Sequence, residues 1–289
     1  MLPKKGHSPF LFFILASLSI LFFLIGFPIT YILINSFTLI DLKDLSYTYV
    51  GLQNFIRVFS DESFYLTLEN TLIWTFVATL GSVSLGLLTA LILNENIAFK
   101  RLFGSLLFIP YAIGYVEAAY MWLWFTNPVY GIFNNFLYTI GLINDPRLSL
   151  FQSRWSALFT VMLVQIWKHF PFMSIILRAG LQNIRRELYE AADIDGAGSI
   201  RKFYNITIPL LKPSIALGSL LTLVHNFNSF TLVWVMTQGG PYGQTHIFAT
   251  YIYQTAFLYL DLGKFMALSD VVFIVIFAIT IIYLRIVKY

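Results

Sequence analysis

The residues of this chain that could do chemistry gather in one central segment. Asp, Glu, Lys and Arg make up only 11% of the 289 residues, yet eight of the eighteen residues from Arg185 to Lys202 are charged. Elsewhere the chain has four scattered His, no Cys and no paired carboxylates at a fixed spacing, so the sequence shows no metal or nucleophile constellation of an enzyme. It also lacks a G-x-x-x-x-G-K-[ST] loop for ATP. The charged segment is therefore interpreted as a contact surface for another molecule.

The composition indicates an integral membrane protein. Apolar residues make up 58% of the chain, aromatic residues 18%, and the mean hydropathy is +0.76. A soluble domain cannot bury so large an apolar share, so the surplus must face lipid. The absence of Cys excludes disulfides and thiolate metal sites. The positions of the basic residues follow membrane topology, which argues against a nucleic-acid partner.

Six stretches are long and apolar enough to cross a bilayer, which takes roughly 20 residues of helix. The predicted spans are residues 10–35, 70–93, 104–125, 155–176, 211–236 and 265–284. The first is interpreted as an uncleaved span, because its apolar core is too long for a signal peptide and no small-residue cleavage site ends it. We therefore expect an all-α integral membrane protein with residues 1–289 in a single transmembrane domain.

The basic residues predict the orientation of these spans. Lys and Arg concentrate on the cytoplasmic side of membrane proteins. With the N-terminus inside, the outer segments hold five, Lys168 lies within a span, and the inner segments hold twelve: Lys4, Lys5, Lys100, Arg101, Arg178, Arg185, Arg186, Arg201, Lys202, Lys212, Arg285 and Lys288. Both termini and the central loop, residues 178–210, are thus predicted to be cytoplasmic.

The central loop is predicted to fold into two short amphipathic helices. Arg185 to Asp193 is rich in helix formers, and its apolar residues recur at three- and four-residue steps. Gly196 and Gly198 break the pattern, and we expect a left-handed conformation at one of them. Ser199 is expected to cap a second short helix that reaches about Asn205. Pro209 and Pro213 then fix the start of the fifth span.

Two kinds of contact partner are compatible with this loop, lipid headgroups and a protein. A helix of this kind can lie on lipid headgroups. Anionic lipid would repel its acidic residues, which are Glu187, Glu190, Asp193 and Asp195. A surface that carries both signs of charge favours a protein partner.

The loop resembles the cytoplasmic signature of permease subunits of binding-protein-dependent ABC importers. The motif reads EAA-x-x-DGA-(x)5-F-x-x-I-x-x-P-x-x-x-P, and its matching positions are Glu190, Ala191, Ala192, Asp195, Gly196, Ala197, Phe203, Ile206, Pro209 and Pro213. The resemblance implies that this loop, including Glu187, is the coupling helix that sits in a groove of the ATPase subunit. It implies that Glu190 is the polar anchor and Gly196 the tight corner. Their alternatives are a solvated charge and a simple helix stop.

Further runs extend the resemblance over nearly the whole chain and towards the oligosaccharide and glycerol-phosphate branch. They are YVGLQNFIRVF from Tyr49, ENTLIW from Glu69, FIPYAIGYVEAAYMWLWFTNPVYGIFNNFL from Phe108, QIWKHFPF from Gln165, LRAGLQNIRRELYEAADIDGA from Leu177 and FNSFTLVWVMTQGGPYGQT from Phe227. The chain departs from the family at Arg185, where a proline is common.

The resemblance implies a type I ABC importer permease fold with half of the translocation pathway. It implies a second, homologous permease, two ATPase subunits that carry ATP and Mg, and an extracytoplasmic solute-binding protein, all at the inner membrane of a prokaryote. This chain would bind no cofactor itself and would not be an enzyme. The implied solute is a sugar or oligosaccharide, with glycerol-3-phosphate or a related polyol phosphodiester as the alternative.

Polar residues inside the predicted spans are candidates for the solute pathway. Asn226, Asn228, Ser229 and Phe230 lie together near the end of the fifth span. In related maltose permeases a polar, Asn-containing turn here lines the sugar site, and Asn228 and Ser229 match it. Interhelical hydrogen bonding is the alternative role. Trp167 is interpreted as a packing or interfacial residue, with sugar stacking as the alternative.

Two carboxylates also lie within the predicted spans. An ionised carboxylate there costs at least about 2.5–3.5 kcal/mol unless it is paired or hydrated. Glu117 and Asp270 are therefore expected to contact a polar solute or to pair with Lys168 or Lys264, although Asp270 near the outer interface would need no partner.

A proton-coupled secondary transporter and a membrane-embedded enzyme are the two alternative classes of protein. A proton-coupled secondary transporter could use Glu117, His225 or Asp270 as a relay. It predicts inverted repeats with interrupted spans, which the sequence does not indicate, and it leaves the central loop without a role. A membrane-embedded enzyme would need a catalytic constellation.

Overall fold

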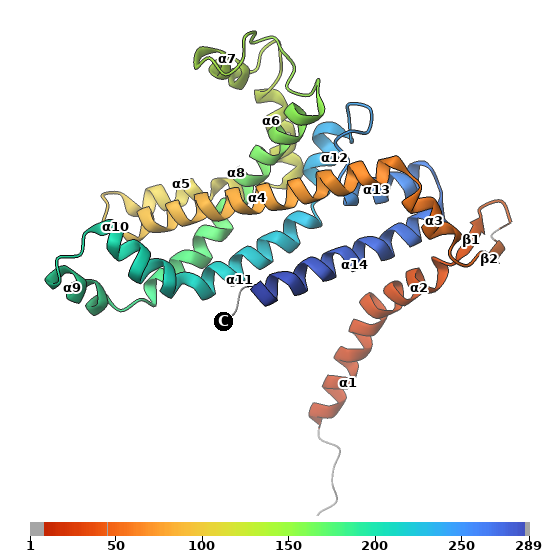
Figure 1. The fold of residues 1–289 in the computed structure, drawn as a ribbon, viewed down its shortest axis with the longest axis horizontal. Helices are drawn as coiled ribbons and strands as arrows, with labels where there is room; N and C mark the ends of the chain where they lie inside the picture. The colour runs from red at the N-terminus through yellow and green to blue at the C-terminus, as the bar shows by residue number, and fades with distance from the viewer. Residues whose placement is uncertain (1–8, 45, 287–289) are drawn as a thin grey trace, which may run out of the picture. The chain divides into compact units, whose positions relative to one another are not determined.

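The structure is a computed structural model that describes residues 9–44 and 46–286. Lys4, Lys5 and Lys288 of the topology argument, like the two chain ends, lie outside the described residues. The chain divides into two compact units, Met1–Phe64 with Ile252–Val275 and Tyr65–Tyr251 with Ile276–Tyr289. Nearly every element is a helix (Figure 1).

The elements follow the chain in this order. The first half holds α1 (Pro9–Leu21), the π-helical turn η1 (Phe22–Gly26), α2 (Phe27–Asn35), β1 (Thr38–Asp41), β2 (Ser46–Tyr49), α3 (Gln53–Phe59), α4 (Glu62–Asn94), α5 (Lys100–Ala112), α6 (Tyr115–Phe125) and α7 (Ile132–Thr139). The second half holds α8 (Arg154–Gln182), α9 (Arg186–Ile194), α10 (Ser199–Lys202), the π-helical turn η2 (Phe203–Thr207), α11 (Ile208–Phe227), α12 (Thr231–Thr237), α13 (Phe248–Tyr253), the π-helical turn η3 (Gln254–Leu258) and α14 (Leu262–Ile286).

The long helices agree with a membrane protein of up to six spans. Within the described residues, five helices are long and apolar enough to cross a membrane: Phe12–Asn35, Glu62–Asn94, Arg154–Gln182, Ser199–Phe227 and Leu262–Ile286. The pair α5 and α6 makes a sixth span if it is counted as one. Phe12–Asn35 buries none of its most apolar stretch, as expected for a surface that faces lipid or another chain.

The third span is broken, and the prediction of a continuous helix over residues 104–125 is wrong. α5 and α6 meet at an angle of 98°. Ile113 and Gly114 are extended at the corner, with ψ of 139° and 158°. The apolar composition of this stretch, which was the basis of the prediction, carries no sign of the corner. The expectation that no span is interrupted fails at the same place.

The fifth span begins earlier than residue 211. α10, η2 and α11 form one continuous helix from Ser199 to Phe227, so the expected separate short helix is part of the span. A proline ring clashes with the carbonyl four residues before it, and for Pro209 that carbonyl belongs to Asn205 inside η2. The wider π-helical turn accommodates the ring. Gly198, and not Ser199, occupies the N-cap position.

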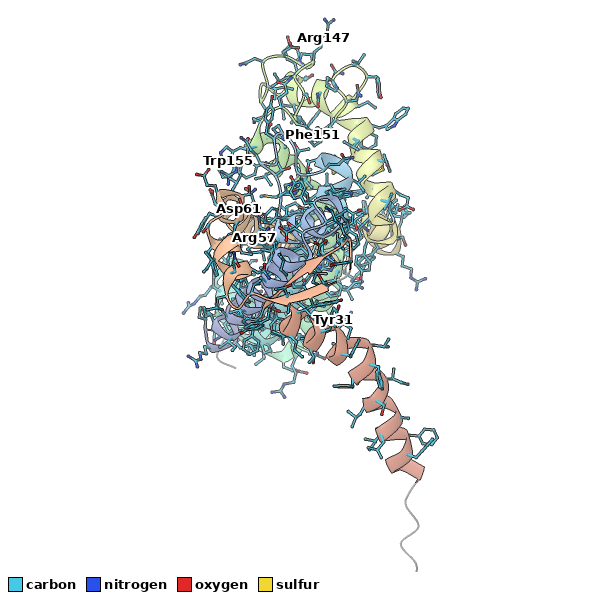
Figure 2. All side chains as sticks on the ribbon, turned by 90° about the vertical axis from the view of Figure 1, so that its right-hand side faces the viewer. Tyr31, Arg57, Asp61, Arg147, Phe151 and Trp155 are labelled. Atoms are coloured by element: carbon cyan, nitrogen blue, oxygen red, sulfur yellow. The ribbon has the colours of Figure 1, made fainter. Side chains whose placement is uncertain are left out.

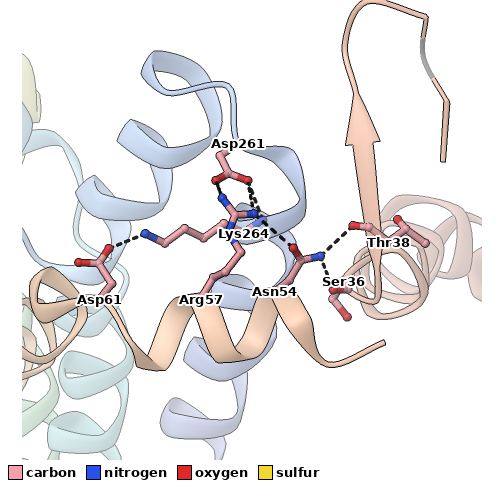
Figure 3. Close-up of polar contacts among 7 residues, drawn as sticks. All are labelled: Ser36, Thr38, Asn54, Arg57, Asp61, Asp261 and Lys264. Atoms are coloured by element: carbon pink, nitrogen blue, oxygen red, sulfur yellow. Dashed lines mark hydrogen bonds and ion pairs between the residues drawn. The ribbon is translucent and has the colours of Figure 1, made fainter. Parts of the chain in front are cut away.

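In the first unit, a polar clamp joins α3 to the start of α14 (Figure 3). The Arg57 guanidinium donates to both Asp261 oxygens, one of them at 3.2 Å, and Lys264 pairs with Asp61. Asn54 is buried and donates to the carbonyls of Ser36 at 2.9 Å and Thr38 at 2.8 Å. The clamp fixes the loop after α2, where β1 and β2 form an antiparallel hairpin with Thr38 opposite Tyr49.

Figure 2 shows Tyr31 and Arg57 with the side chains around them, and Tyr31 shares a hydroxyl–hydroxyl hydrogen bond of 3.1 Å with Tyr47. The same view labels Phe151 and Trp155 at the start of α8 in the second unit. There the Arg154 guanidinium lies 4.5 Å above the Trp155 ring and pairs with Glu69 at 2.8 Å.

The core of the second unit lies among α4, α6, α8 and α12. Its largest buried side chains include Trp74, Trp122, Leu158 and Met162. A second cluster lies around Met173 and Leu211. Here the helices approach so closely that a Cβ added to Gly86 would lie 2.7 Å from Met173, and one added to Gly218 would lie 2.6 Å from it. Glycine at both positions permits this approach. Small residues at such contacts are typical of helix packing in membranes.

Candidate functional site

The corner of the third span opens into a cavity of about 610 Å³ in the second unit. α5, α6, α8 and α11 supply its walls, and its polar and aromatic lining residues are Tyr111, Tyr115, Lys168, His169, Phe172 and His225. We refer to it as the corner cavity. It combines aromatic faces with a small number of hydrogen-bonding groups, as ligand sites commonly do.

Lys168 holds the corner together. Its ammonium donates to the carbonyls of Pro110 at 3.2 Å and Tyr111 at 3.3 Å, and also to that of Ile113. These carbonyls belong to the end of α5, where the helix leaves its last acceptors without a partner. A cation is favourable at the negative end of a helix dipole. The ammonium also lies 4.4 Å from the Tyr115 ring centroid, so the environment of Lys168 compensates its burial.

Two histidines form the wall opposite this corner. The rings of His169 and His225 are stacked at 4.5 Å and are 7° from parallel. His225 shares a 2.8 Å hydrogen bond with the hydroxyl of Tyr115. His169 is only 4% exposed, and neither of its ring nitrogens has a hydrogen-bond partner among the described residues. A buried polar group without a partner is costly, which points to a ligand or water as its partner.

A second hollow of about 300 Å³ adjoins the corner cavity. It shares Tyr115 and His225 with that cavity and adds Asn228, Ser229 and Phe230. Three of the residues expected in the solute pathway therefore lie together here. Asn228 ends α11, is exposed, and donates to the Val224 carbonyl at 2.9 Å. The Phe230 ring stacks with that of Trp234 at 5.7 Å.

Asn226 lies elsewhere, in a buried network between helices. Its side chain accepts from Gln165 at 2.7 Å and donates to Thr79 at 3.0 Å. Its carbonyl accepts from the Trp74 indole at 2.9 Å. This Asn226 network, made of Asn226, Gln165, Thr79 and Trp74, is the interhelical bonding that was the alternative for this residue.

The other predicted pathway residues are dispersed. Trp167 packs edge-on against Trp122 with centroids 5.6 Å apart, as a core residue. Glu117 is exposed in the first turn of α6 with its carboxylate against Gly114. Asp270 is 6% exposed and interacts with the Ser36 hydroxyl in the first unit. Among the described residues neither carboxylate forms an ion pair within 4.0 Å, although Glu117 interacts electrostatically with Lys168, so contact with a polar solute stays a prediction for both.

The predicted coupling loop forms a second candidate site, which we call the coupling hairpin, residues 186–207. Gly196 has φ of +72°, which confirms a left-handed glycine at the turn. The Ala197 amide donates back to the Ala192 carbonyl at 2.8 Å and closes the end of α9. Arg185 occupies the N-cap with φ of −67°, the value that proline would fix, so its replacement of proline leaves the helix start intact.

The outer face of the coupling hairpin is open to contact. Ile194, between Asp193 and Asp195, is 88% exposed, and Ile200, beside Arg201, is 77% exposed. The predicted contact residues Glu187, Glu190, Ala191, Asp195, Gly196 and Pro209 are exposed, and Ala192, Ala197 and Phe203 are half-buried. A hollow of about 500 Å³ lies between residues 192–197 and residues 201–206 of the hairpin. Exposed apolar residues beside charges are typical of a protein contact surface.

The corner cavity was not predicted from the sequence. Lys168 was expected only as a charge within a span and as an alternative partner for Glu117 or Asp270, and His169, Tyr111 and Tyr115 were not candidates. One signal was available, because a lysine inside an apolar helix marks a polar environment. The carbonyls that surround Lys168 lie 55 to 58 residues before it, and no local pattern connects them.

A helical chain with up to six candidate spans, a cavity with polar groups among α5, α6, α8 and α11, and an exposed hairpin agrees with a membrane transport subunit. The chain matches the family model described as binding-protein-dependent transport system inner membrane component over residues 82–289, and it belongs to this family. It is therefore a multi-pass permease subunit of an ABC importer, and its own role is transport and not catalysis.

Curated relatives cover most of the chain. It is 36% identical over 266 residues to the sulfoquinovosyl glycerol transport system permease protein SmoG of Agrobacterium fabrum, covering 92% of this chain and 85% of that protein. It is 36% identical over 241 residues to the trehalose/maltose transport system permease protein MalF of Thermococcus litoralis, covering 82% and 79%. The sn-glycerol-3-phosphate transport system permease protein UgpA of Yersinia enterocolitica is 33% identical over 255 residues, covering 88% and 85%.

Two solved structures share the fold. Both are of a bacterial alginate ABC transporter, one in complex with an alginate pentasaccharide-bound periplasmic protein. Their TM-scores are 0.81 and 0.82, at 24% and 25% identity, and each match covers 96% of this chain and 95% of the other. These likenesses confirm the predicted permease fold.

Proposed function

We propose that this chain forms half of the pathway by which a sugar or oligosaccharide crosses the membrane. The corner cavity and the adjoining hollow are the surface that the solute contacts. The observation that carries the proposal is the buried His169 ring, whose two nitrogens lack partners among the described residues. A sugar hydroxyl can bind such a nitrogen, and the Tyr115 and Phe172 rings beside it suit the apolar face of a sugar.

The relatives support a saccharide. The printed names of two of them specify trehalose or maltose and sulfoquinovosyl glycerol, and the solved relatives import alginate. A glycerol phosphate is the alternative, since a third relative carries that name. An anionic solute, whether a glycerol phosphate or an acidic saccharide such as alginate, would need a free cation in the cavity, whereas a neutral saccharide such as trehalose or maltose would not. Lys168 is the cation of the cavity lining, and its three donors are already engaged by carbonyls.

The coupling hairpin is proposed to bind an ATPase subunit on the cytoplasmic side. The twelve-to-five distribution of Lys and Arg supports cytoplasmic termini and a cytoplasmic hairpin. Two ATPase subunits that carry ATP and Mg, a homologous second permease and an extracytoplasmic binding protein would complete the importer in a prokaryotic inner membrane. A proton-coupled carrier would have no ATPase partner, so co-purification separates the two mechanisms.

The solute site is tested by changing His169. The importer is reconstituted with its binding protein and tested with maltose, trehalose, alginate oligosaccharide and sn-glycerol-3-phosphate as probes. For the saccharide that supports uptake, His169→Phe should lower uptake at least about tenfold with complex assembly unchanged. The matched control is His246→Asn, because His246 is also 4% exposed but lines neither hollow. Unchanged uptake in His169→Phe would place the solute elsewhere.

The hairpin is tested by Glu190→Lys, which reverses the charge of a 60% exposed side chain. We expect the ATPase to be lost from the purified complex and uptake to stop, with membrane insertion intact. Gln182→Lys, also exposed and four residues before α9, is the control and should retain both. Normal uptake and normal solute-stimulated ATPase activity in Glu190→Lys, and likewise in Gly196→Asp, would contradict docking at this hairpin.

A further inference from the structure

We propose that the hydrogen bond between Tyr189 and Thr207 transmits the movement of α9 to the walls of the corner cavity. The Tyr189 hydroxyl lies 2.9 Å from the Thr207 hydroxyl. Tyr189 comes from α9, and Thr207 is the last residue of η2 in the fifth span. This makes Tyr189 a positioning residue for transport. The inference rests on the proposed function, because it requires that an ATPase moves α9.

First, polar side-chain contacts attach α9 mainly to the fifth span. Among the described residues, two polar side-chain contacts leave α9, and both end on the continuous helix Ser199–Phe227. They are Asp193–Lys202 at 2.7 Å and Tyr189–Thr207. The ion pair Arg186–Glu190 at 3.1 Å stays within α9. In Figure 1, α9 stands beside α10 at one end of the second unit.

The second step is that the two contacts differ in strength. The Asp193 and Lys202 side chains are 60% and 22% exposed, so salt and solvent weaken their pairing. Thr207 is buried and Tyr189 is half-buried. A hydrogen bond away from water is also costly to leave unmade. The Tyr189–Thr207 bond is therefore the firmer connection.

The third step is that a displacement at Thr207 reaches the cavity. α11 follows Thr207 directly and runs as one helix of 20 residues, roughly 30 Å long, to Phe227, with Pro213 near its start. α11 also packs tightly on α8, since a Cβ on Gly180 would overlap the Ser214 side chain and one on Gly218 would overlap Met173. Helices in such close contact move together. The two stacked histidines, one on each helix, thus move with them.

The fourth step concerns the position of the bond in η2. A π-helical turn interrupts the regular hydrogen-bond pattern of an α-helix, and such turns are frequent at functional sites. Without a connection beyond this turn, a displacement of α10 would deform η2 and leave α11 in place. Thr207 lies at the end of η2 nearest α11, so the bond from Tyr189 bypasses the deformable turn.

The experiment uses the absence of Cys from the chain. Asn228→Cys introduces a single thiol at an exposed residue of the adjoining hollow, and a bimane label there reports movement. The complete complex is reconstituted in nanodiscs, and ATP alone is the probe. We expect Tyr189→Phe to lower the ATP-dependent fluorescence change to about a third or less. ATP hydrolysis and ATPase co-purification should stay within about twofold of the parent.

Four further variants make the result specific. Thr207→Val should reproduce the loss. The double variant Tyr189→Phe with Thr207→Val should be no worse than either single variant, because each single variant already removes the same hydrogen bond. Thr207→Ser keeps a hydroxyl and should keep the response. Tyr120→Phe is the matched control, because Tyr120 lies outside the hairpin, is 58% exposed and forms no hydrogen bond through its hydroxyl among the described residues.

Four results would overturn the proposal. A full fluorescence change in Tyr189→Phe, or losses that add up in the double variant, would show that this bond does not carry the movement. If the parent protein itself binds no ATPase and gives no ATP-dependent change, the proposed function fails and the inference fails with it. If Tyr189→Phe instead loses its ATPase, the bond serves docking and the transmission role is wrong.

Discussion

The Asn226 network and the coupling hairpin both depend on polar contacts, but they place them in opposite surroundings. Asn226, Gln165 and the Trp74 indole are buried among three helices, α4, α8 and α11. The ion pairs of the hairpin are exposed, with the Arg186 side chain at 88% and that of Glu190 at 60%. The buried contacts cannot be replaced by water, whereas the exposed ones can.

This difference separates stability from coupling. Removing a group from the buried network leaves its partners unsatisfied and lowers the free energy of unfolding. Removing an exposed contact from the hairpin exchanges it for water at little cost, so its effect is expected on transport. The predictions below test this separation, from the largest expected change in unfolding free energy to the smallest.

Asn226→Leu should give the largest destabilisation. It leaves the Gln165 amide and the Thr79 hydroxyl without their partner in a buried place, at a cost of about 2–4 kcal/mol. Thermal unfolding in detergent measures the effect. The control is Asn228→Leu, two residues later and exposed, which should unfold nearly as the parent does. Equal losses in both variants would remove the distinction between buried and exposed amides.

Acid should destabilise the second unit through His246. Burial lowers the pKa of His246 from 6.5 to about 4 in the folded chain. Folding therefore favours the neutral ring. The stabilisation is complete above pH 6.5 and is lost as the pH falls towards 4, by roughly 3 kcal/mol over the full interval. His246→Asn, which keeps a polar group near Thr250, should show a flatter profile of unfolding temperature between pH 7.5 and 4.5. Parallel profiles would assign the acid sensitivity to other groups.

Gly196→Ala should cost about 1 kcal/mol of stability and reduce uptake several-fold. The cause is backbone conformation, since φ is +72° and no atom lies within 4 Å of the new Cβ. Gly198→Ala is a close control, because Gly198 has equally open space but φ of −67°. ATP consumed per solute imported is the measurement. Equal behaviour of the two variants would argue against a conformational requirement at the corner.

Arg186→Gln should change the unfolding free energy least, by less than about 0.5 kcal/mol. It removes an exposed ion pair four residues apart on one helix, and such pairs contribute little. The difference from the parent should shrink further at high salt. A loss above about 1 kcal/mol, measured by chemical denaturation, would mean that the hairpin contributes to the stability of the fold.

The parts of the fold that were predictable depend on local patterns. The spans that became α4, α8 and α14 follow from uninterrupted apolar length, and α9 with its left-handed Gly196 follows from helix formers that end at a glycine. The corner at Ile113 was not predictable, because Ile and Gly are both acceptable in a membrane helix. The early start of the fifth span was hidden as well, since prolines usually mark a helix start and here a π-helical turn accommodates Pro209.

The residues of the two candidate sites also differ in whether a local sequence pattern reveals them. The hairpin motif and the polar turn at Asn228 and Ser229 are contiguous in sequence and were found there. The cavity depends on Lys168 and His169 in α8 and His225 in α11, whose partners are one another and residues 110–115, distant in the sequence. Similarly, Asn226 and Asn228 are two residues apart, yet one is buried in a network and the other faces a hollow.

The sequence by itself determined that this chain is a membrane permease with a hairpin for a partner, because apolar length and motif spacing are properties of neighbouring residues. Only the tertiary structure decided which polar groups meet inside the membrane. That outcome depends on the rotation and depth of each helix relative to the others, and those are set by close packing, as at Met173 between Gly86 and Gly218.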